Sequence, residues 1–185
     1  MNRFTLFGAA FAAALATAGL VTQFGLGGGD KVQIGDGSVS ALGRAARTGD
    51  ALPRSILAYP FAGRNFASPD GRGSRVLSVH GSLTLYAVPG KAGMVCLIEA
   101  DSFAETAGGA CADRSVLKTG TIYMADRQED GSLQVAGLVG DGHTFAEANG
   151  RRTAVENNSF LLAQVEGTDL SIGSPTETQQ IDLGG

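Results

Sequence analysis

Hydrophobic and polar residues alternate along two neighbouring stretches near the middle of the chain. The first runs from Leu83 to Val88 and the second from Met94 to Glu99, on either side of the turn Pro89 to Gly93. Strict alternation predicts strands with one buried face. Proline presets φ at about −65° and glycine accepts a positive φ, so Pro-Gly suits a turn. We therefore predict a hairpin, with the positive φ at the glycine that follows the proline.

The same signature recurs along the chain as far as residue 165. Shorter apolar runs are separated by the turn pairs Asp-Gly at 130–131, Asp-Gly at 141–142 and Asn-Gly at 149–150. Asn-Gly is the strongest signal, because both central residues of a type I′ turn need positive φ. The further predicted strands are 75–79, 121–125, 132–139, 143–148, 152–155 and 159–165, with one short helix over 112–117. This pattern predicts a mainly β fold, a small antiparallel sheet curled into a barrel or sandwich.

The N-terminus carries an uncharged apolar run from residue 4 to residue 26, just after Asn2-Arg3. A helix that spans a bilayer core needs about 20 apolar residues, so residues 1–28 are predicted to be a membrane anchor that begins with an apolar helix. The alternative is a secretory signal cleaved near Ala18, after the small-residue stretch Ala16-Thr17-Ala18. The run extends beyond that point, which favours the uncleaved anchor. Either way the rest of the chain is predicted to be exported.

Composition divides the remainder into three parts. Residues 29–73 begin with glycines and show no sustained period, so we predict a flexible linker that contains glycine and arginine. Residues 74–172 hold the predicted strands and form the β domain. Residues 173–185 are polar, and we predict a disordered tail.

Charge is distributed unevenly along a chain whose net charge is −4. Arginines dominate residues 44–75, whereas the last twenty residues carry acids and no base. Such segments can attract one another or a partner, although solvated linkers also explain them. The domain itself is acidic and lacks strands that combine aromatic and basic residues, so we expect no nucleic-acid partner.

The two cysteines, Cys96 and Cys111, are predicted to form a disulfide. Cys96 lies within a predicted strand, and Cys111 follows fifteen residues later after a glycine-rich stretch that we interpret as a loop. Closing a loop of that length stabilises a fold by roughly 3 kcal/mol in the chain-entropy model. An exported domain occupies a compartment where disulfides persist.

Several short stretches between Leu83 and Phe160 resemble a group of uncharacterised actinobacterial exported proteins. They are YAVPG at 86–90, VCL at 95–97, GAC at 109–111, VAGLVGDG at 135–142 and VENNSF at 155–160. Gly140 stands where that group usually has a proline. The resemblance implies an N-terminal anchor followed by one small, cysteine-bridged extracytoplasmic domain. It implies no activity.

Candidate catalytic residues are few. A serine-histidine-carboxylate site would use His143 with a serine such as Ser159, but the chain has no G-x-S-x-G motif and no C-x-x-C motif. The other histidine, His80, lies on a separate predicted strand. Residues 126–133 superficially match a calcium loop, yet Gly137 stands where the bidentate glutamate is required, so a hairpin turn is the better interpretation. We therefore predict no catalytic residue, no metal site and no cofactor.

These observations favour a non-enzymatic binding or interaction module, held at the cell membrane by a single N-terminal span with its domain outside the cytoplasm. The membrane is one expected partner, and the other is an unidentified protein or cell-envelope component. Two alternatives stay open. One is a small extracytoplasmic hydrolase that uses His143, and the other is an envelope sensor that responds to the redox state of its disulfide.

Overall fold

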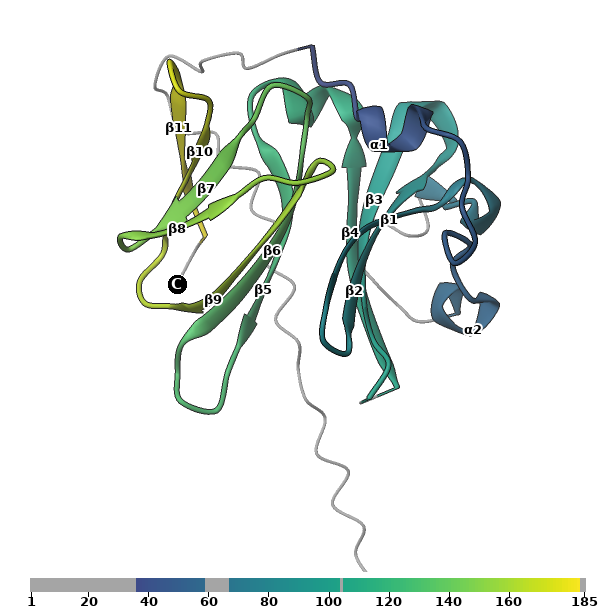
Figure 1. Cartoon of the computed structure of the whole chain (residues 1–185), viewed down its shortest axis with the longest axis horizontal. Coiled ribbons are helices and arrows are strands. Elements are labelled where there is room, and N and C mark those ends of the chain that lie inside the picture. Colours follow the sequence, from purple (N-terminus) through teal and green to yellow (C-terminus); the bar gives the residue numbers. More distant parts are fainter. Residues whose placement is uncertain (1–35, 59–66, 104, 184–185) are drawn as a thin grey trace, which may run out of the picture.

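The computed structural model describes residues 36–58, 67–103 and 105–183, which form three antiparallel sheets (Figure 1). Sheet A has the order β1-β2-β3-β4, sheet B the order β5-β6-β9 and sheet C the order β11-β10-β7-β8. Sheet A contains β1 (Arg75–His80), β2 (Leu83–Pro89), β3 (Met94–Asp101) and β4 (Thr106–Asp113). Sheet B contains β5 (Thr121–Arg127), β6 (Leu133–Val139) and β9 (Ser159–Val165). Sheet C contains β7 (Phe145–Ala148), β8 (Arg151–Ala154), β10 (Asp169–Gly173) and β11 (Thr178–Asp182).

The three sheets lie face to face, with sheet B in the middle (Figure 1). One apolar cluster, which includes Leu85, Leu97 and Leu138, fills the space between sheets A and B. A second cluster, which includes Phe160 and Ile172, fills the space between sheets B and C. The mainly β prediction is confirmed. The barrel alternative is wrong, because the strands divide into three separate sheets instead of closing on one another.

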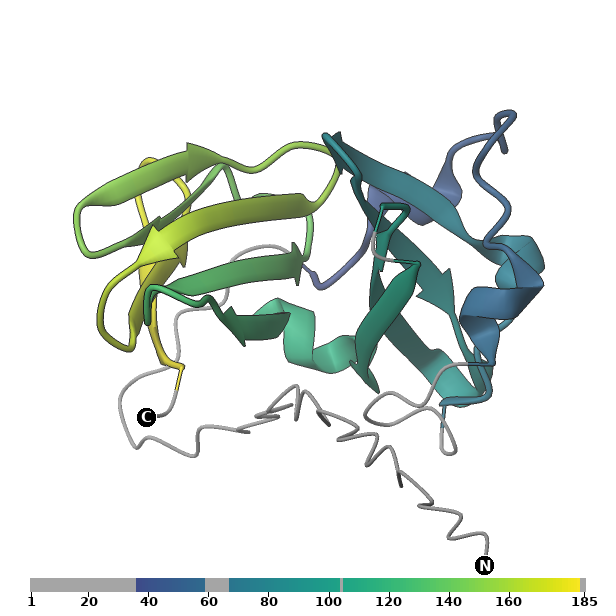
Figure 2. The same ribbon diagram turned by 90° about the horizontal axis from the view of Figure 1, so that it is seen from below.

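The described residues before β1, which we call the N-terminal layer, include the short helices α1 (Ser40–Gly43) and α2 (Arg54–Leu57) and a 3₁₀ turn at Gly71–Gly73. The part from residue 52 onward packs on the outer face of sheet A, whereas Val39 and Ala41 are buried in the cluster between sheets A and B. Figure 2 shows α2 on the side of sheet A that faces away from sheet B. Leu52 and Ala67 are buried there against Val88 and Ile98. The predicted flexible linker over 29–73 is therefore wrong for its described part, which is packed and hydrogen-bonded without being periodic.

The C-terminal residues complete sheet C. Strand β11 pairs with β10 along its whole length, from Gly173 opposite Thr178 to Asp169 opposite Asp182. Leu183 is only 1% exposed. The predicted disordered tail over 173–185 is wrong for residues 173–183. A pattern of hydrophobic residues does not predict β11, because this edge strand is polar. It is held by backbone pairing with β10 on one side, and alternate side chains face solvent.

The central hairpin and the Asn-Gly turn are confirmed. β2 pairs with β3 in the register Leu83 opposite Asp101 through Pro89 opposite Val95, and Asn149 and Gly150 both have positive φ. In the β2–β3 turn, however, the left-handed residues are Ala92 and Gly93, and the expectation for Gly90 is wrong. Gly90 is needed for space instead, since a Cβ there would lie 2.5 Å from the Ala67 carbonyl oxygen.

The disulfide between Cys96 and Cys111 is present and buried. The two residues lie directly opposite each other on β3 and β4, with their Cα atoms 4.0 Å apart. The glycine-rich stretch before Cys111, predicted as a loop, forms part of β4. The predicted helix over 112–117 is replaced by the end of this strand and a 3₁₀ turn at Arg114–Lys118.

The predicted apolar helix at residues 4–26 lies outside the described residues. Within residues 36–58, 67–103 and 105–183, no helix has the length and apolar character that crossing a membrane requires.

Two carboxylates face each other between sheets A and B, where most neighbours are apolar. Glu99 on β3 accepts a hydrogen bond from Gln134 of β6, with 3.4 Å between Nε2 and Oε1. Burial, together with the negative charges of Asp126 and Asp101, raises the pKa of Glu99 to about 7. Burial also raises the pKa of Asp126. The folded protein therefore binds a proton at Glu99 more tightly than the unfolded chain does.

This linkage predicts that the contribution of Glu99 to stability falls as pH rises from about 4.5 to about 7. At pH 8, Glu99→Gln should raise the free energy of unfolding by about 1–2 kcal/mol, after allowance for partial solvent screening. At pH 4 the same variant should match the parent protein. Urea unfolding at the two pH values measures the difference, and Glu129→Gln in an exposed turn is the matched control. Equal effects of Glu99→Gln at both pH values would contradict the prediction.

Candidate functional site: a groove beside strand β1

A groove of about 520 Å³ runs between residues 44–50 and the edge strand β1. We call it the β1 groove. Its lining combines charged, hydroxyl, amide and apolar side chains from the N-terminal layer, from β1 and β2, and from the turn before β9. The lining residues are Arg44, Arg47, Thr48, Gly49, Asp50, Val76, Leu77, Ser78, Val79, Thr84, Tyr86 and Asn157.

An ion pair forms one wall of the groove. The guanidinium of Arg44 donates to both carboxylate oxygens of Asp50, each at 2.7 Å. Asp50 also accepts the backbone N–H groups of Arg47 at 2.6 Å and Val76 at 2.9 Å. The hydrogen bonds from Arg44 are the main reason that the pKa of Asp50 lies well below its usual range. The side chain of Asp50 is 5% exposed, so the pair is a largely desolvated, charge-neutral support.

The same residues close the open edge of sheet A. The N–H of Val76 donates to Asp50, and its C=O accepts from Arg44 at 3.0 Å. The next carbonyl, that of Leu77, accepts from the side-chain amide of Asn157 at 3.1 Å. Unpaired edge groups invite another strand, and here side chains occupy them. A ligand at this part of the groove would therefore meet side chains and not a free backbone edge.

Further hydrogen bonds brace the wall from behind. Arg75 donates from Nε to the carbonyl of Arg44 at 3.0 Å. The buried hydroxyl of Ser74 donates to the carbonyl of Asp50 at 2.6 Å and accepts from the N–H of Leu52 at 2.9 Å. Each of these bonds joins residues 44–52 to Ser74 or Arg75, at or just before the start of β1. The groove is thus built in advance of any ligand.

Two groups remain available to a ligand. The guanidinium of Arg47 is exposed and makes no hydrogen bond or ion pair with any described residue. The hydroxyl of Tyr86 likewise hydrogen-bonds to no described residue, although the side chain is 9% exposed. Burial, and next the charge of Asp50, raise the pKa of Tyr86, so the phenol is neutral and can donate. A permanent cation and a neutral donor in one groove suit an anionic group with oxygen acceptors.

The candidate catalytic residues make separate contacts. His143 is 6% exposed, and its Nδ1 lies 2.9 Å from the carbonyl oxygen of Gly140. Its Nε2 has no partner among the described residues, and burial lowers its pKa. The hydroxyl of Ser159 instead contacts Ser78 at 3.2 Å and the carbonyl of Glu156 at 3.1 Å. No described hydrogen bond joins His143 to Ser159.

The residues considered from the sequence as a calcium loop form a turn, and the two cysteines are buried. Residues 128–132 form the hairpin turn of β5–β6, closed by a 2.8 Å hydrogen bond from the N–H of Gln128 to the carbonyl of Ser132. In the described part of the chain, no three His, Cys, Asp or Glu side chains are grouped so as to hold a metal ion. The sulfurs of the disulfide are buried, which limits the access that a reactive or sensing cysteine needs.

The residues of the β1 groove were not identified from the sequence. Arg44 and Asp50 lie in a stretch without periodicity, and Tyr86 resembles any aromatic residue of a β-strand. Asn157 and Asn158 lie in the turn before β9, and both have positive φ, which asparagine tolerates. The side chain of Asn158 also anchors α1, accepting the N–H of Ala41 at 3.0 Å.

These features define a disulfide-bridged domain of three stacked β-sheets with a pre-built polar groove. Comparison with known proteins adds no further assignment, since no family model, no curated protein and no solved structure matches the chain.

Proposed function

We propose that this chain is a non-enzymatic binding module, held at the cell membrane by residues 1–28, with its β domain outside the cytoplasm and its ligand in the β1 groove. The observation that carries the proposal is that the guanidinium of Arg47 and the hydroxyl of Tyr86, neither hydrogen-bonded to a described residue, line the same groove, whose walls are already fixed. A rigid site costs little ordering on binding. Two features support a location outside the cytoplasm: the apolar run at 4–26, and the disulfide, a bond that persists outside the cytosol.

The groove favours a ligand with a carboxylate or phosphate group and neighbouring hydroxyls, as in a cell-envelope polymer. Arg47 would hold the anionic group, and Tyr86 would donate to a ligand oxygen. Thr48 and Thr84 add hydroxyls that both donate and accept. The apolar side chains of Val76 and Val79 complete the contact surface.

Binding to this groove is tested by titrating the protein with glucuronate and with inorganic phosphate, using neutral glucose as the uncharged comparison. We expect Arg47→Gln to weaken binding of the anions about 10-fold or more, and Tyr86→Phe to weaken it about 5-fold, since hydrogen bonds to charged groups contribute about 1.5–3 kcal/mol and neutral ones about 1 kcal/mol. Arg54→Gln, on α2 outside the groove, is the matched control. Amide NMR shifts at Ser78 and Thr84 locate the site. Equal binding by Arg47→Gln and the parent would refute this assignment.

The anchor is tested by measuring the intact mass of the protein from membrane and medium fractions, with and without alkylation of free thiols. We expect the full-length mass in the membrane fraction and no alkylation of Cys96 or Cys111. A shorter protein in the medium, cleaved near Ala18, would show that residues 1–28 contain a secretory signal and not an uncleaved anchor.

A further inference from the structure

Two large apolar side chains are exposed in the described part of the chain, Phe103 at 90% and Val79 at 62%. Both lie at one end of sheet A. Phe103 is in the turn between β3 and β4, and Val79 is near the turn between β1 and β2. The two turns are joined, because Ser102 donates from its N–H to the carbonyl of Ser82 at 3.0 Å and from its hydroxyl to the same oxygen at 3.1 Å.

The turn that carries Phe103 is held in place by its own hydrogen bonds. The carboxylate of Asp101 accepts the N–H of Phe103 at 2.8 Å. Together with the bonds from Ser102, this contact fixes the backbone beneath an aromatic ring that faces water. Exposing such a ring gains nothing for folding, whereas a pre-positioned aromatic residue is a typical anchor of a protein interface.

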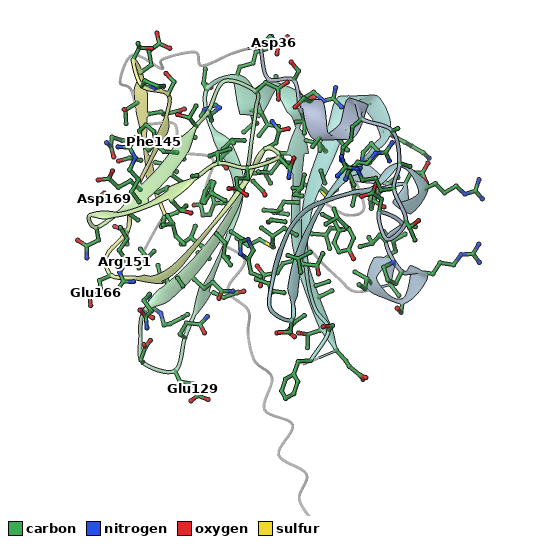
Figure 3. The ribbon with its side chains drawn as sticks, in the orientation of Figure 1. Asp36, Glu129, Phe145, Arg151, Glu166 and Asp169 are labelled. Carbon is green, nitrogen blue, oxygen red and sulfur yellow. A yellow bond between two sulfur atoms is a disulfide. The ribbon has the colours of Figure 1, made fainter. Side chains whose placement is uncertain are left out.

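Acidic residues lie at the same end of the molecule as this anchor (Figure 1). Asp101 and Glu105 flank Phe103 in sequence, and the adjacent hairpin β5–β6 contributes two exposed acids and one base. The sheets touch here, through the hydrogen bond from Gln134 to Glu99. Figure 1 shows the β3–β4 and β5–β6 turns at the same end of the molecule, and Figure 3 shows Glu129 projecting from it. The exposed acids of the second hairpin are Glu129 and Asp130, and its base is Arg127, which donates to the carbonyl of Gly131.

We propose that this surface, the acidic end, docks a protein partner that carries lysines and arginines around an apolar pocket for Phe103. Charge complementarity selects the partner, and the aromatic side chain supplies most of the affinity. The acidic end comprises Asp101, Phe103, Glu105, Glu129 and Asp130; Val79 lines the neighbouring β1 groove and is not part of it. An anionic lipid surface is disfavoured, because at least four acids would approach negative head groups beside the single arginine. This surface is separate from the β1 groove and its anionic ligand.

The test uses the full chain in cells that produce it natively, with the photo-crosslinker p-benzoylphenylalanine in place of Phe103. The matched control places it at Thr176, which is also exposed but lies in the β10–β11 turn. We expect a protein adduct from position 103 and none from position 176. Mass spectrometry should map the adduct to a site with at least two lysines or arginines beside apolar residues.

The partner identified in this way then serves as the binding probe. We expect Phe103→Ser to weaken binding at least 10-fold with an unchanged urea midpoint, since the ring is 90% exposed. Glu129→Lys with Asp130→Lys should also weaken binding, and rising salt should lower the affinity of the parent. Arg47→Gln should leave this binding unchanged, which separates it from the β1 groove. The proposal is overturned by the absence of a protein adduct, by adducts confined to lipid or to a second copy of this chain, or by a contact surface without basic residues.

Discussion

Replacing Asp50 with asparagine is expected to lower the free energy of unfolding by about 3 kcal/mol, the lower end of the range for breaking a buried ion pair. The variant removes the negative charge that receives two 2.7 Å hydrogen bonds from Arg44. It leaves a guanidinium whose side chain is 21% exposed without its counter-charge. It also disturbs the acceptors for the backbone N–H groups of Arg47 and Val76, so the whole N-terminal layer is loosened from sheet A. Urea unfolding followed by tyrosine fluorescence measures the change, since the chain has no tryptophan.

A control and a double-mutant cycle separate the ion pair from general effects of charge. Asp70→Asn changes another carboxylate of the same layer, one that caps a 3₁₀ turn by accepting the N–H of Arg72 at 3.0 Å; its cost should stay below about 0.5 kcal/mol. Arg44→Met combined with Asp50→Asn should cost less than the sum of the two single changes, by about 2 kcal/mol. Additive losses would show that the pair does not act as a unit.

The contribution of Asp50 to stability depends on pH with the opposite sign to the contribution of Glu99. The pKa of Asp50 is lowered in the folded protein, so its stabilising effect is complete above about pH 4 and is lost as pH falls further. Acid unfolding should therefore begin at a higher pH in a variant that lacks Arg44.

Removing the disulfide through Cys96→Ala with Cys111→Ala is expected to lower the free energy of unfolding by about 3 kcal/mol, as estimated for a loop of fifteen residues. The bridge joins directly opposed residues of β3 and β4 and lies under the N-terminal layer beside Leu52 and Ala67. Its loss thus relaxes the unfolded chain and also leaves unfilled space in the apolar cluster on the outer face of sheet A. Urea unfolding of parent and variant under identical conditions measures the effect.

The single variants provide the control for the bridge. Cys96→Ala and Cys111→Ala should each lose nearly as much stability as the pair, because either change opens the same loop. Added reductant should lower the urea midpoint of the parent toward that of the double variant and leave the double variant unchanged. Matching midpoints for parent and double variant would show that the bridge contributes nothing to stability.

Strand positions followed from local pattern because the alternation of side chains is a local property of extended backbone. The hairpin β2–β3 and the Asn-Gly turn before β8 are examples. The pairing of Cys96 with Cys111 followed instead from the presence of two cysteines in a domain predicted to be exported. The division of these strands into three sheets did not follow from pattern. Sheet B is covered on both faces, and its strand β6 is apolar on both sides, which indicates burial without naming the partners.

The errors at the two ends of the domain share one cause. Residues 36–58 and 67–73 have little regular structure, and β11 is polar, so neither carries a hydrophobic period. They are held by contacts with residues distant in sequence, such as Asp50 with Val76 and the backbone pairing of β11 with β10. Propensity and period describe neighbours along the chain and contain no information about such partners.

The amino-acid sequence by itself determined the β character of the domain, most of its turns and its disulfide, because each depends on residues that lie close together or on the chemistry of two cysteines. Only the tertiary structure decided which strands share a sheet, where the N-terminal layer packs, and which side chains line the β1 groove and the acidic end. The physical reason is that a groove and a docking surface arise from side chains that folding brings together across the intervals between Arg47 and Asn157 and between Phe103 and Glu129.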